Sequence, residues 1–388
     1  MLPKEGFVRL THTAQVLKHR ARKFLKWVSL VTPVRPLFRV LFMRPFWFLR
    51  FRFAKTDSSS PKVSLVMAVW NNETMVGDAI RSARAQSWPN LEIIIVDDGS
   101  TDQTGKIVDG FASARVRVLH QKNAGPGAAR NKGVDQIAGS KYLVFLDSDD
   151  LLPIHGVRRL VESAENSGSP FVIGKLERFD GIRRFDRRDN VQVYARDRKG
   201  ITIEDEPRVL SDANISAKLY RMDFWDSAGL RFPEGVVYED MPVVVTAYLS
   251  APQFDIVSKC VNLWRVRGEG QSITQKKTEV KSLADRLTAI ERIYNQLLDF
   301  EKAGKISKRV RELYLERIIG LDLQLFVVKL GDADQEFFDV FAKRGGELVA
   351  EASEAIWASA GGAYKELVRL AVTGDRAKTL ERLAALGL

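Results

Sequence analysis

Residues Leu91–Ser100, with the sequence LEIIIVDDGS, indicate the fold more directly than any other stretch. The run is apolar almost without interruption, which is typical of a central strand buried on both faces. It ends in two carboxylates, Asp97 and Asp98, followed by a glycine and a serine. In open α/β sheets ligands bind at the carboxyl ends of the strands. We therefore expect Asp97 and Asp98 to lie at a binding site.

Three other stretches repeat the pattern of an apolar run that ends in polar or glycine-rich residues: Lys62–Val69, Arg115–Leu119 and Tyr142–Leu146. Apolar residues at helical spacing follow the strands, in Glu73–Gln86, Gln103–Ala112, Pro126–Ala138 and Ile154–Asn166. This alternation of strands and helices predicts an α/β fold with a mostly parallel, doubly wound sheet. The polar ends of the four strands then share one edge of that sheet.

Charge and composition divide the 388-residue chain into four parts. Residues 1–56 hold 13 Lys and Arg against one acid, and the rest of the chain is close to neutral. We predict a basic, amphipathic, helical N-terminal extension (1–56), a linker (57–61), an α/β domain (62–275) and an all-helical accessory region (276–388). The single cysteine excludes an internal disulfide.

The N-terminal extension mixes Phe, Leu and Trp with arginines and contains no apolar run long enough to cross a bilayer. This composition favours a segment that lies in the interface of a membrane and contacts anionic lipid. A helical arm packed on the protein is the alternative, and we expect no nucleic acid as partner. The helical accessory region holds no concentrated polar motif, so it either packs on the α/β domain or mediates self-association as a homo-oligomer.

Residues 175–213 interrupt the alternation of strands and helices. The segment is polar and rich in arginine up to Gly200. We interpret it as a long excursion, partly extended, near the rim of the site, and a solvated surface loop is the more conservative expectation.

Carboxylates at the end of the fourth strand suggest a metal site. Asp147, Ser148 and Asp149 follow the apolar run directly, so both carboxylates can face the cleft if the chain turns there. Hard oxygen ligands of this kind suit Mg²⁺ or Mn²⁺ that also holds a diphosphate. Asp-x-Asp is frequent in loops by chance, but its position beside Asp97 and Asp98 strengthens the interpretation.

Three further stretches each allow a functional and a structural interpretation. The glycine-containing turn at 123–131 could bind an anion through free backbone N–H groups, or it could be a turn capped by Asn123. Residues 232–240 end in Glu239 and Asp240, of which one could act as a general base or Asp240 could cap a helix. Arg265 and Arg267 beside a glycine-rich turn could close on a diphosphate or could be surface charges.

Taken together, these stretches resemble the motifs of family 2 glycosyltransferases with the GT-A fold. The resemblance runs from about Lys62 to Thr274 and rests on six stretches in the family's order: VSLVMAVWNNE, LEIIIVDDGSTD, NAGPGAARN, YLVFLDSDD, FPEGVVYEDM and RVRGEGQSIT. The later stretches are most similar to bacterial enzymes that build cell-wall and capsular polymers, teichoic-acid glycosyltransferases among them. The resemblance implies that residues 62–275 form a GT-A, Rossmann-like glycosyltransferase domain.

The resemblance implies a role for each matching position. Asp240 would be the catalytic base, and Glu239 would orient it or the acceptor. Asp149 would bind Mg²⁺ or Mn²⁺, and Asp147 would contact the metal or the ribose. The nucleotide-sugar would be held by the remaining motif residues: Val69, Asn71, Glu73, Asp97, Asp98, Arg130, Ser148, Arg265, Arg267 and Ser272.

The family comparison also shows departures and defines the expected reaction. Ala68 and Trp70 stand where the first strand often has Pro and Tyr, and Ser216-Ala217 replaces an aromatic residue on the acceptor side. We expect inverting transfer from a nucleotide-sugar, a UDP-sugar as first choice, to a hydroxyl of a cell-surface glycan or lipid-linked polymer. The expected location is cytoplasmic, peripheral on the inner face of a bacterial plasma membrane. A nucleotidyltransferase or a non-catalytic scaffold of the same fold are the alternatives.

Overall fold

The computed structural model describes residues 57–186, 191–266 and 279–388. The N-terminal extension 1–56 and the sites expected at Arg267 and Ser272 lie outside these residues. No helix within the described ranges is both long and apolar enough to span a bilayer.

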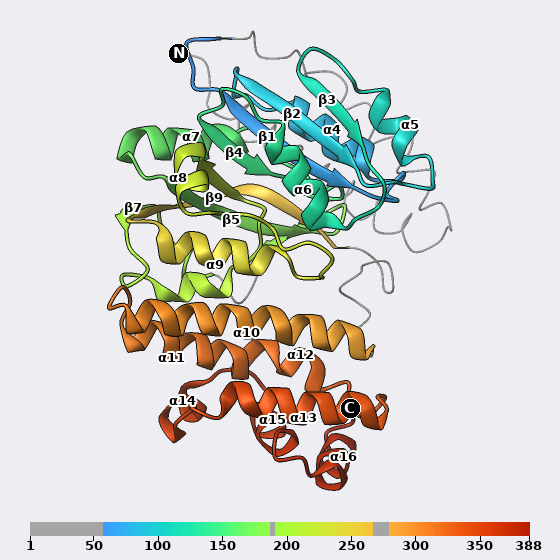
Figure 1. Cartoon of the computed structure of the whole chain (residues 1–388), viewed down its shortest axis with the longest axis vertical. Coiled ribbons are helices and arrows are strands. Elements are labelled where there is room, and N and C mark those ends of the chain that lie inside the picture. Colours follow the sequence, from blue (N-terminus) through green and yellow to red (C-terminus); the bar gives the residue numbers. More distant parts are fainter. Residues whose placement is uncertain (1–56, 187–190, 267–278) are drawn as a thin grey trace, which may run out of the picture. The chain divides into compact units, whose positions relative to one another are not determined.

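A nine-stranded mixed sheet forms the centre of the first part (Figure 1), in the order β3-β2-β1-β4-β8-β5-β9-β7, with β6 paired to β5. Strands β1 to β4 are mutually parallel, whereas β8 is antiparallel to both β4 and β5. Strand β5 therefore runs in the direction of β4, and its carboxyl end lies at the same edge. The bounds are β1 Val63–Val69, β2 Leu91–Asp97, β3 Val116–His120, β4 Tyr142–Phe145, β5 Phe171–Phe179, β6 Arg184–Asp186, β7 Arg198–Ile201, β8 Lys218–Arg221 and β9 Phe254–Arg265.

Both faces of strand β2 are buried, as the sequence predicts. Ile94 and Val96 belong to one hydrophobic cluster, and Ile93 and Ile95 belong to the other. Helices cover both faces of the sheet, which is why residues 93–96 in the middle of the strand are all apolar. These helices are α4 Val76–Arg84, α5 Thr104–Asp109, α6 Pro126–Asp135, α7 Gly156–Ser167, α8 Met222–Ser227 and α9 Asp240–Ser250.

Two local expectations differ from the structure. Asn123 was expected to cap α6, but its side chain donates to the backbone oxygen of Asp98. Residues 175–213 do not form a solvated loop throughout. Strand β5 continues to Phe179, β6 and β7 extend the sheet, and a 3-10 turn follows at Pro207–Ser211. Val193, Tyr194 and Ile203 are buried there, so apolar side chains hold this polar segment against the sheet.

The C-terminal region is helical, as predicted. Its elements are α10 Val280–Lys302, α11 Lys308–Arg317, a π-helical turn at Ile318–Asp322, α12 Gln324–Val327, α13 Gln335–Val349, α14 Glu354–Ser359, α15 Lys365–Ala371 and α16 Arg376–Ala385. The large apolar side chains at helical spacing on α10 are buried: Leu283, Leu287, Ile290, Ile293, Tyr294 and Leu297.

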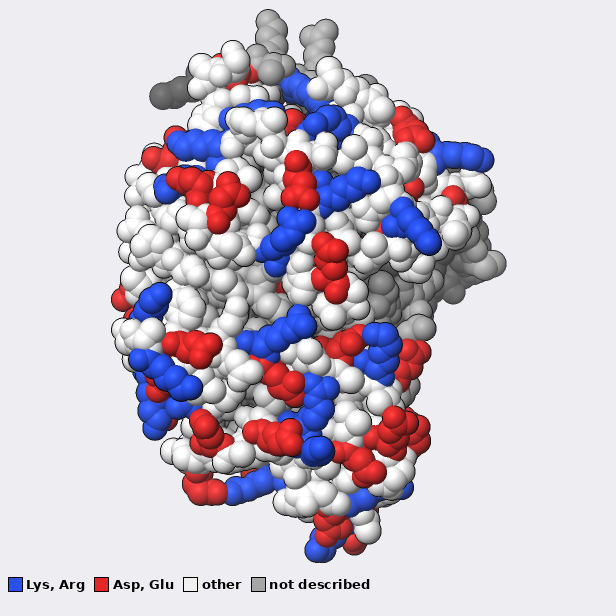
Figure 2. Space-filling model, viewed as in Figure 1, with Lys and Arg blue, Asp and Glu red and all other residues white. Residues whose placement is uncertain are grey.

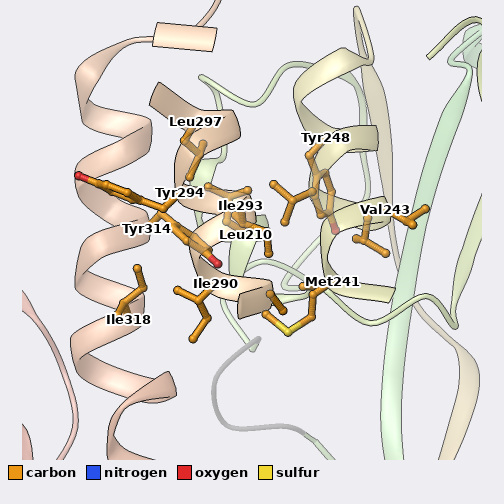
Figure 3. Packing of buried hydrophobic residues seen from close by; sticks show 14 of the residues in the cluster. Leu210, Met241, Val243, Tyr248, Ile290, Ile293, Tyr294, Leu297, Tyr314 and Ile318 are labelled. Carbon is orange, nitrogen blue, oxygen red and sulfur yellow. The ribbon is translucent and has the colours of Figure 1, made fainter. Parts of the chain in front are cut away.

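The helical region packs on the α/β part through helix α9. Side chains of α9, α10 and α11 meet in one hydrophobic cluster (Figure 3), which also contains the face of the sheet covered by α6. Gln296 of α10 donates a 2.9 Å hydrogen bond to the hydroxyl of Thr246 on α9. The helical region was expected either to pack on the α/β domain or to mediate self-association. The structure shows that it packs on the α/β part.

The surface charge of the described part is mixed. Acidic and basic side chains are interspersed over the face shown in Figure 2, in keeping with a near-neutral body. The excess of basic residues belongs to the extension 1–56.

Candidate active site

The loops that follow β1 and β2 are tied together by side chains expected to bind nucleotide. The amide oxygen of Asn71 accepts a 2.7 Å hydrogen bond from the backbone N–H of Thr101. The carboxylate of Glu73 accepts from the N–H of Gln103 at 2.9 Å. The carbonyl of Val69 accepts from the N–H of Asp98 at 2.9 Å. These contacts fix the shape of the sheet edge at the place predicted from the sequence.

Asp97 and Asp98 are both buried, and they point to different partners. Asp97 bonds to Nδ1 of His120 at 2.9 Å, and this bond, with another from Asp109, raises the pKa of His120. Asp98 accepts from the N–H groups of Ala124 and Gly125, each at 2.9 Å. The backbone N–H groups before α6 were considered as a site for an anion. In the structure they bind the carboxylate of Asp98.

The three acids in the loop after β4 separate into two kinds. Asp147 and Asp149 are partly exposed, whereas Asp150 is fully buried. Asp150 accepts from the side chain of Asn262 at 2.9 Å and from the backbone N–H of Arg265 at 3.0 Å. Burial, together with the charges of Asp149 and Asp147, raises the pKa of Asp150 well above its usual value. Asp150 is therefore a structural group.

Asp147 and Asp149 fit a site for a divalent cation. Within the described ranges no three His, Cys, Asp or Glu side chains gather to enclose an ion by themselves. Mg²⁺ commonly takes only one or two carboxylates and completes its shell with water and substrate phosphates. Ser148, between the two acids, is held by a 2.9 Å bond from the amide of Asn72. Nε of Arg265 donates to the backbone oxygen of Asp149 at 2.8 Å.

A buried arginine connects the loop after β4 with the candidate base. Arg130 of α6 donates to Glu239 and, at 2.8 Å, to Asp147. Its guanidinium also lies 5.4 Å from the ring centre of Phe232. Burial opposes the charged form of Arg130, but the carboxylates of Glu239, Asp147 and Asp240 outweigh it and raise its pKa. The guanidinium expected to contact a diphosphate is here bound to two acids.

Asp240 is the first residue of helix α9 beside this ion pair, and the N-cap residue is Glu239, so Asp240 is not the helix cap that the sequence allowed. Burial, followed by the charge of Glu239, raises the pKa of Asp240 to about 7, although Arg130 and Arg286 act in the opposite direction. A carboxylate with this pKa exchanges its proton near neutral pH, as a general base must.

Three non-glycine residues within the described ranges have positive φ angles, and all of them adjoin the candidate site. They are Asn71 (42°), Ala217 (63°) and Tyr238 (64°). Ala217 follows Ser216, whose hydroxyl lies 3.3 Å from Asp147, and Tyr238 precedes Glu239. Such conformations are sparsely populated and persist only where the surroundings hold them, often at functional sites.

Close packing also fixes the loop before α9. A Cβ atom on Gly127 would lie 2.3 Å from the carbonyl oxygen of Pro233, so only glycine fits there. Asn131, one helical turn further along α6, bonds to both the N–H and the carbonyl of Phe232 at 3.0 and 2.9 Å. Helix α6 therefore positions the loop that leads to Glu239 and Asp240.

Sequence reasoning missed some of the residues at the site. Arg286 belongs to no motif that signals a contact with the site. Asn131 ends the stretch NAGPGAARN and Ser216 departs from the family pattern, but neither residue was expected to contact the site. Trp70 extends from the end of β1 with 46 % of its surface exposed, and an exposed aromatic ring at a ligand-binding edge is the signal that was available.

Comparisons with known proteins find a family match for part of this chain. Residues 64–226 match the family model "Glycosyl transferase family 2". This match shows that the chain contains a family 2 glycosyltransferase domain, and the mixed sheet described above is that of a GT-A fold.

Two relatives come from Bacillus subtilis (strain 168). EpsH is 32 % identical over 185 residues, which are 45 % of this chain and 51 % of EpsH. The uncharacterized glycosyltransferase EpsJ is 29 % identical over 215 residues, 53 % of this chain and 61 % of EpsJ. The match thus spans about half to three fifths of these relatives.

The fold is similar to that of S. aureus TarS 1-349 in complex with UDP. The TM-score is 0.65 at 21 % identity, and the similarity covers 84 % of this chain and 92 % of the TarS chain. TarS 1-349 has also been solved with UDP-GlcNAc, with a TM-score of 0.63 at 21 % identity over 83 % of this chain and 90 % of that one. The likeness includes the helical C-terminal region, because it extends well beyond residues 64–226.

Replacing the buried arginine tests the ion-pair network. We expect Arg130→Met to lower the free energy of unfolding by about 3 kcal/mol, because it leaves Glu239 buried without its cation. The control is Arg231→Met, which breaks an exposed pair with Asp135 and should cost about 0–1 kcal/mol. Urea denaturation followed by tryptophan fluorescence measures both. Equal, small losses for the two variants would show that Arg130 does not stabilise the site.

Proposed function

We propose that the protein is an inverting glycosyltransferase that moves a sugar from a UDP-sugar to a hydroxyl of a cell-surface glycan or lipid-linked polymer. The observation that carries the proposal is the position of Asp240, a carboxylate with a pKa of about 7 beside Arg130, close to the acids at the sheet edge. The solved TarS complexes with UDP and UDP-GlcNAc support the choice of donor.

The proposed mechanism is a single displacement. Asp240 takes the proton from the acceptor hydroxyl while the acceptor oxygen bonds to the anomeric carbon. The bond between that carbon and the diphosphate breaks, and its electron pair leaves with the nucleoside diphosphate. The acceptor attacks from the face opposite the leaving group, so the anomeric configuration inverts. Glu239, held by Arg130, orients the acceptor side of the site.

Asp149 and Asp147 would hold Mg²⁺ or Mn²⁺, which when bound neutralises the charge that builds on the leaving diphosphate. Asn71, Glu73, Asp98 and Ser148 shape the nucleotide side of the site. Arg265 would contact the diphosphate. The same contact is expected of Arg267 and Ser272, which lie outside the described residues.

The pKa of Asp240 predicts the pH dependence of the reaction. A general base is active when deprotonated, so kcat/KM should rise with pH up to about 7 and level off above it. Steady-state rates between about pH 5.5 and 8.5 measure this. Asp240→Asn should bind donor and lack transfer at every pH. A kcat/KM that does not change over this pH range, or transfer by Asp240→Asn, would exclude Asp240 as the base.

The metal role can be tested by thermal unfolding with UDP and Mn²⁺. Saturating ligand at about 100 times its Kd stabilises a protein by about 2.7 kcal/mol. We expect Asp149→Asn to lose most of this ligand-dependent gain. The control Asp150→Asn should retain it, because the oxygens of Asp150 face Asn262 and the backbone of Arg265. An undiminished gain in Asp149→Asn would contradict its role as a metal ligand.

We further propose that residues 1–56 bind the inner face of a bacterial plasma membrane, where a lipid-linked acceptor would be found. The full chain should sediment with membranes from a low-salt lysate, and high salt should release it, because the attraction to anionic lipid is screened. Recovery of the full chain in the low-salt supernatant would contradict the proposal.

A further inference from the structure

Helix α10 of the C-terminal region reaches the loop that carries the candidate base. The guanidinium carbon of Arg286 lies 4.8 Å from the ring centre of Tyr238. The Arg286 side chain is only 12 % exposed. Tyr238 directly precedes Glu239 and Asp240 and has a φ of 64°. A cation therefore packs against the residue whose unusual backbone sets the direction in which the chain enters α9.

A buried acid holds Arg286 in place from the opposite side. Asp322 is fully buried and accepts hydrogen bonds from Arg286 and, at 2.7 Å, from Arg317. Asp322 ends the π-helical turn Ile318–Asp322, where the N–H of Leu323 bonds to the carbonyl of Ile318 at 3.0 Å. π-helical turns are rare and frequently occur at functional sites. The turn places the carboxylate of Asp322 within hydrogen-bonding distance of the Arg286 guanidinium.

Hydrophobic packing between α9 and α10 stabilises the contact between Arg286 and Tyr238. Met241 of α9 and Ile290 of α10 are buried in the same cluster (Figure 3). Asp240 is the neighbour of Met241, and Ile290 lies one helical turn from Arg286. The base and the arginine are thus fixed to two helices that pack on each other.

We propose that Arg286 is a positioning residue for the candidate base, and that the C-terminal helical region thereby forms part of the active centre. Arg286 holds Tyr238 in its left-handed conformation, and Tyr238 in turn fixes the direction of Glu239 and Asp240. The proposal deepens the proposed function, on which its catalytic consequence rests. The anchoring itself can be tested without any activity.

Hydrogen–deuterium exchange of peptides covering residues 234–241 tests the anchoring. We expect faster exchange in Arg286→Met than in the unaltered protein. The matched control is Arg317→Met, which also removes one arginine from Asp322 but whose guanidinium lies over Tyr314 instead of Tyr238. Its exchange in 234–241 should be unchanged. Equal exchange in both variants would overturn the proposal, whether or not transfer is found.

Kinetics test the catalytic consequence. Misplacing a catalytic group by about 1 Å can reduce the rate about 100-fold. We expect Arg286→Met to lower kcat by about 10- to 100-fold with unchanged affinity for UDP, and Arg317→Met to keep kcat within about twofold. Equal losses of kcat in the two variants would reduce Arg286 to a structural role.

A second substitution covers the case in which Arg286→Met does not fold. Tyr238→Asn removes the ring, leaves the pair between Arg286 and Asp322, and tolerates the left-handed backbone. It should also speed exchange in 234–241 and lower kcat. Unchanged exchange and kcat would overturn the anchoring role. If exchange responds as expected but the unaltered protein transfers no sugar, the anchoring stands and the proposed function fails.

Discussion

The guanidinium of Arg130 joins three segments that are distant in the sequence: helix α6, the loop after β4 and the start of α9. It binds Asp147 and Glu239 together, two acids that would otherwise repel each other at a largely buried site. The close contact between Gly127 and Pro233 and the bonds from Asn131 to Phe232 hold the α9 loop near enough for this bridge. The arrangement of the loop after β4 and of the loop that leads to Asp240 depends on that one cation.

The same charges set the protonation of the candidate base. Burial and the neighbouring Glu239 favour the neutral form of Asp240, whereas Arg130 and Arg286 favour the charged form. The balance places the pKa of Asp240 near neutrality. One of these cations comes from the α/β domain and the other from the helical region, so both parts of the chain affect the pKa of Asp240. Helix α9, which begins with Asp240, is also the helix on which α10 packs.

Much of this could be predicted from the sequence, because it depends on local patterns. The apolar run of β2 and the carboxylates after β4 indicate a sheet and its functional edge. The contacts of Arg130 and Arg286 could not be predicted, because a charged residue on a helix looks the same whether its partner is solvent or a distant buried acid. Residues 175–213 were interpreted as more exposed than they are, since buried Leu176 alternates there with charged Lys175 and Glu177.

The proposed function depends most on Asp240 acting as a base during sugar transfer. The most direct measurement is nucleotide release from a panel of UDP-, GDP- and dTDP-sugars, with Mn²⁺, Mg²⁺ or chelator, by the full chain and by Asp240→Asn. The account predicts metal-dependent release from a UDP-sugar, which is lost in Asp240→Asn while UDP still binds. Release that Asp240→Asn retains would contradict it, and the absence of both release and nucleotide binding would favour a non-catalytic scaffold.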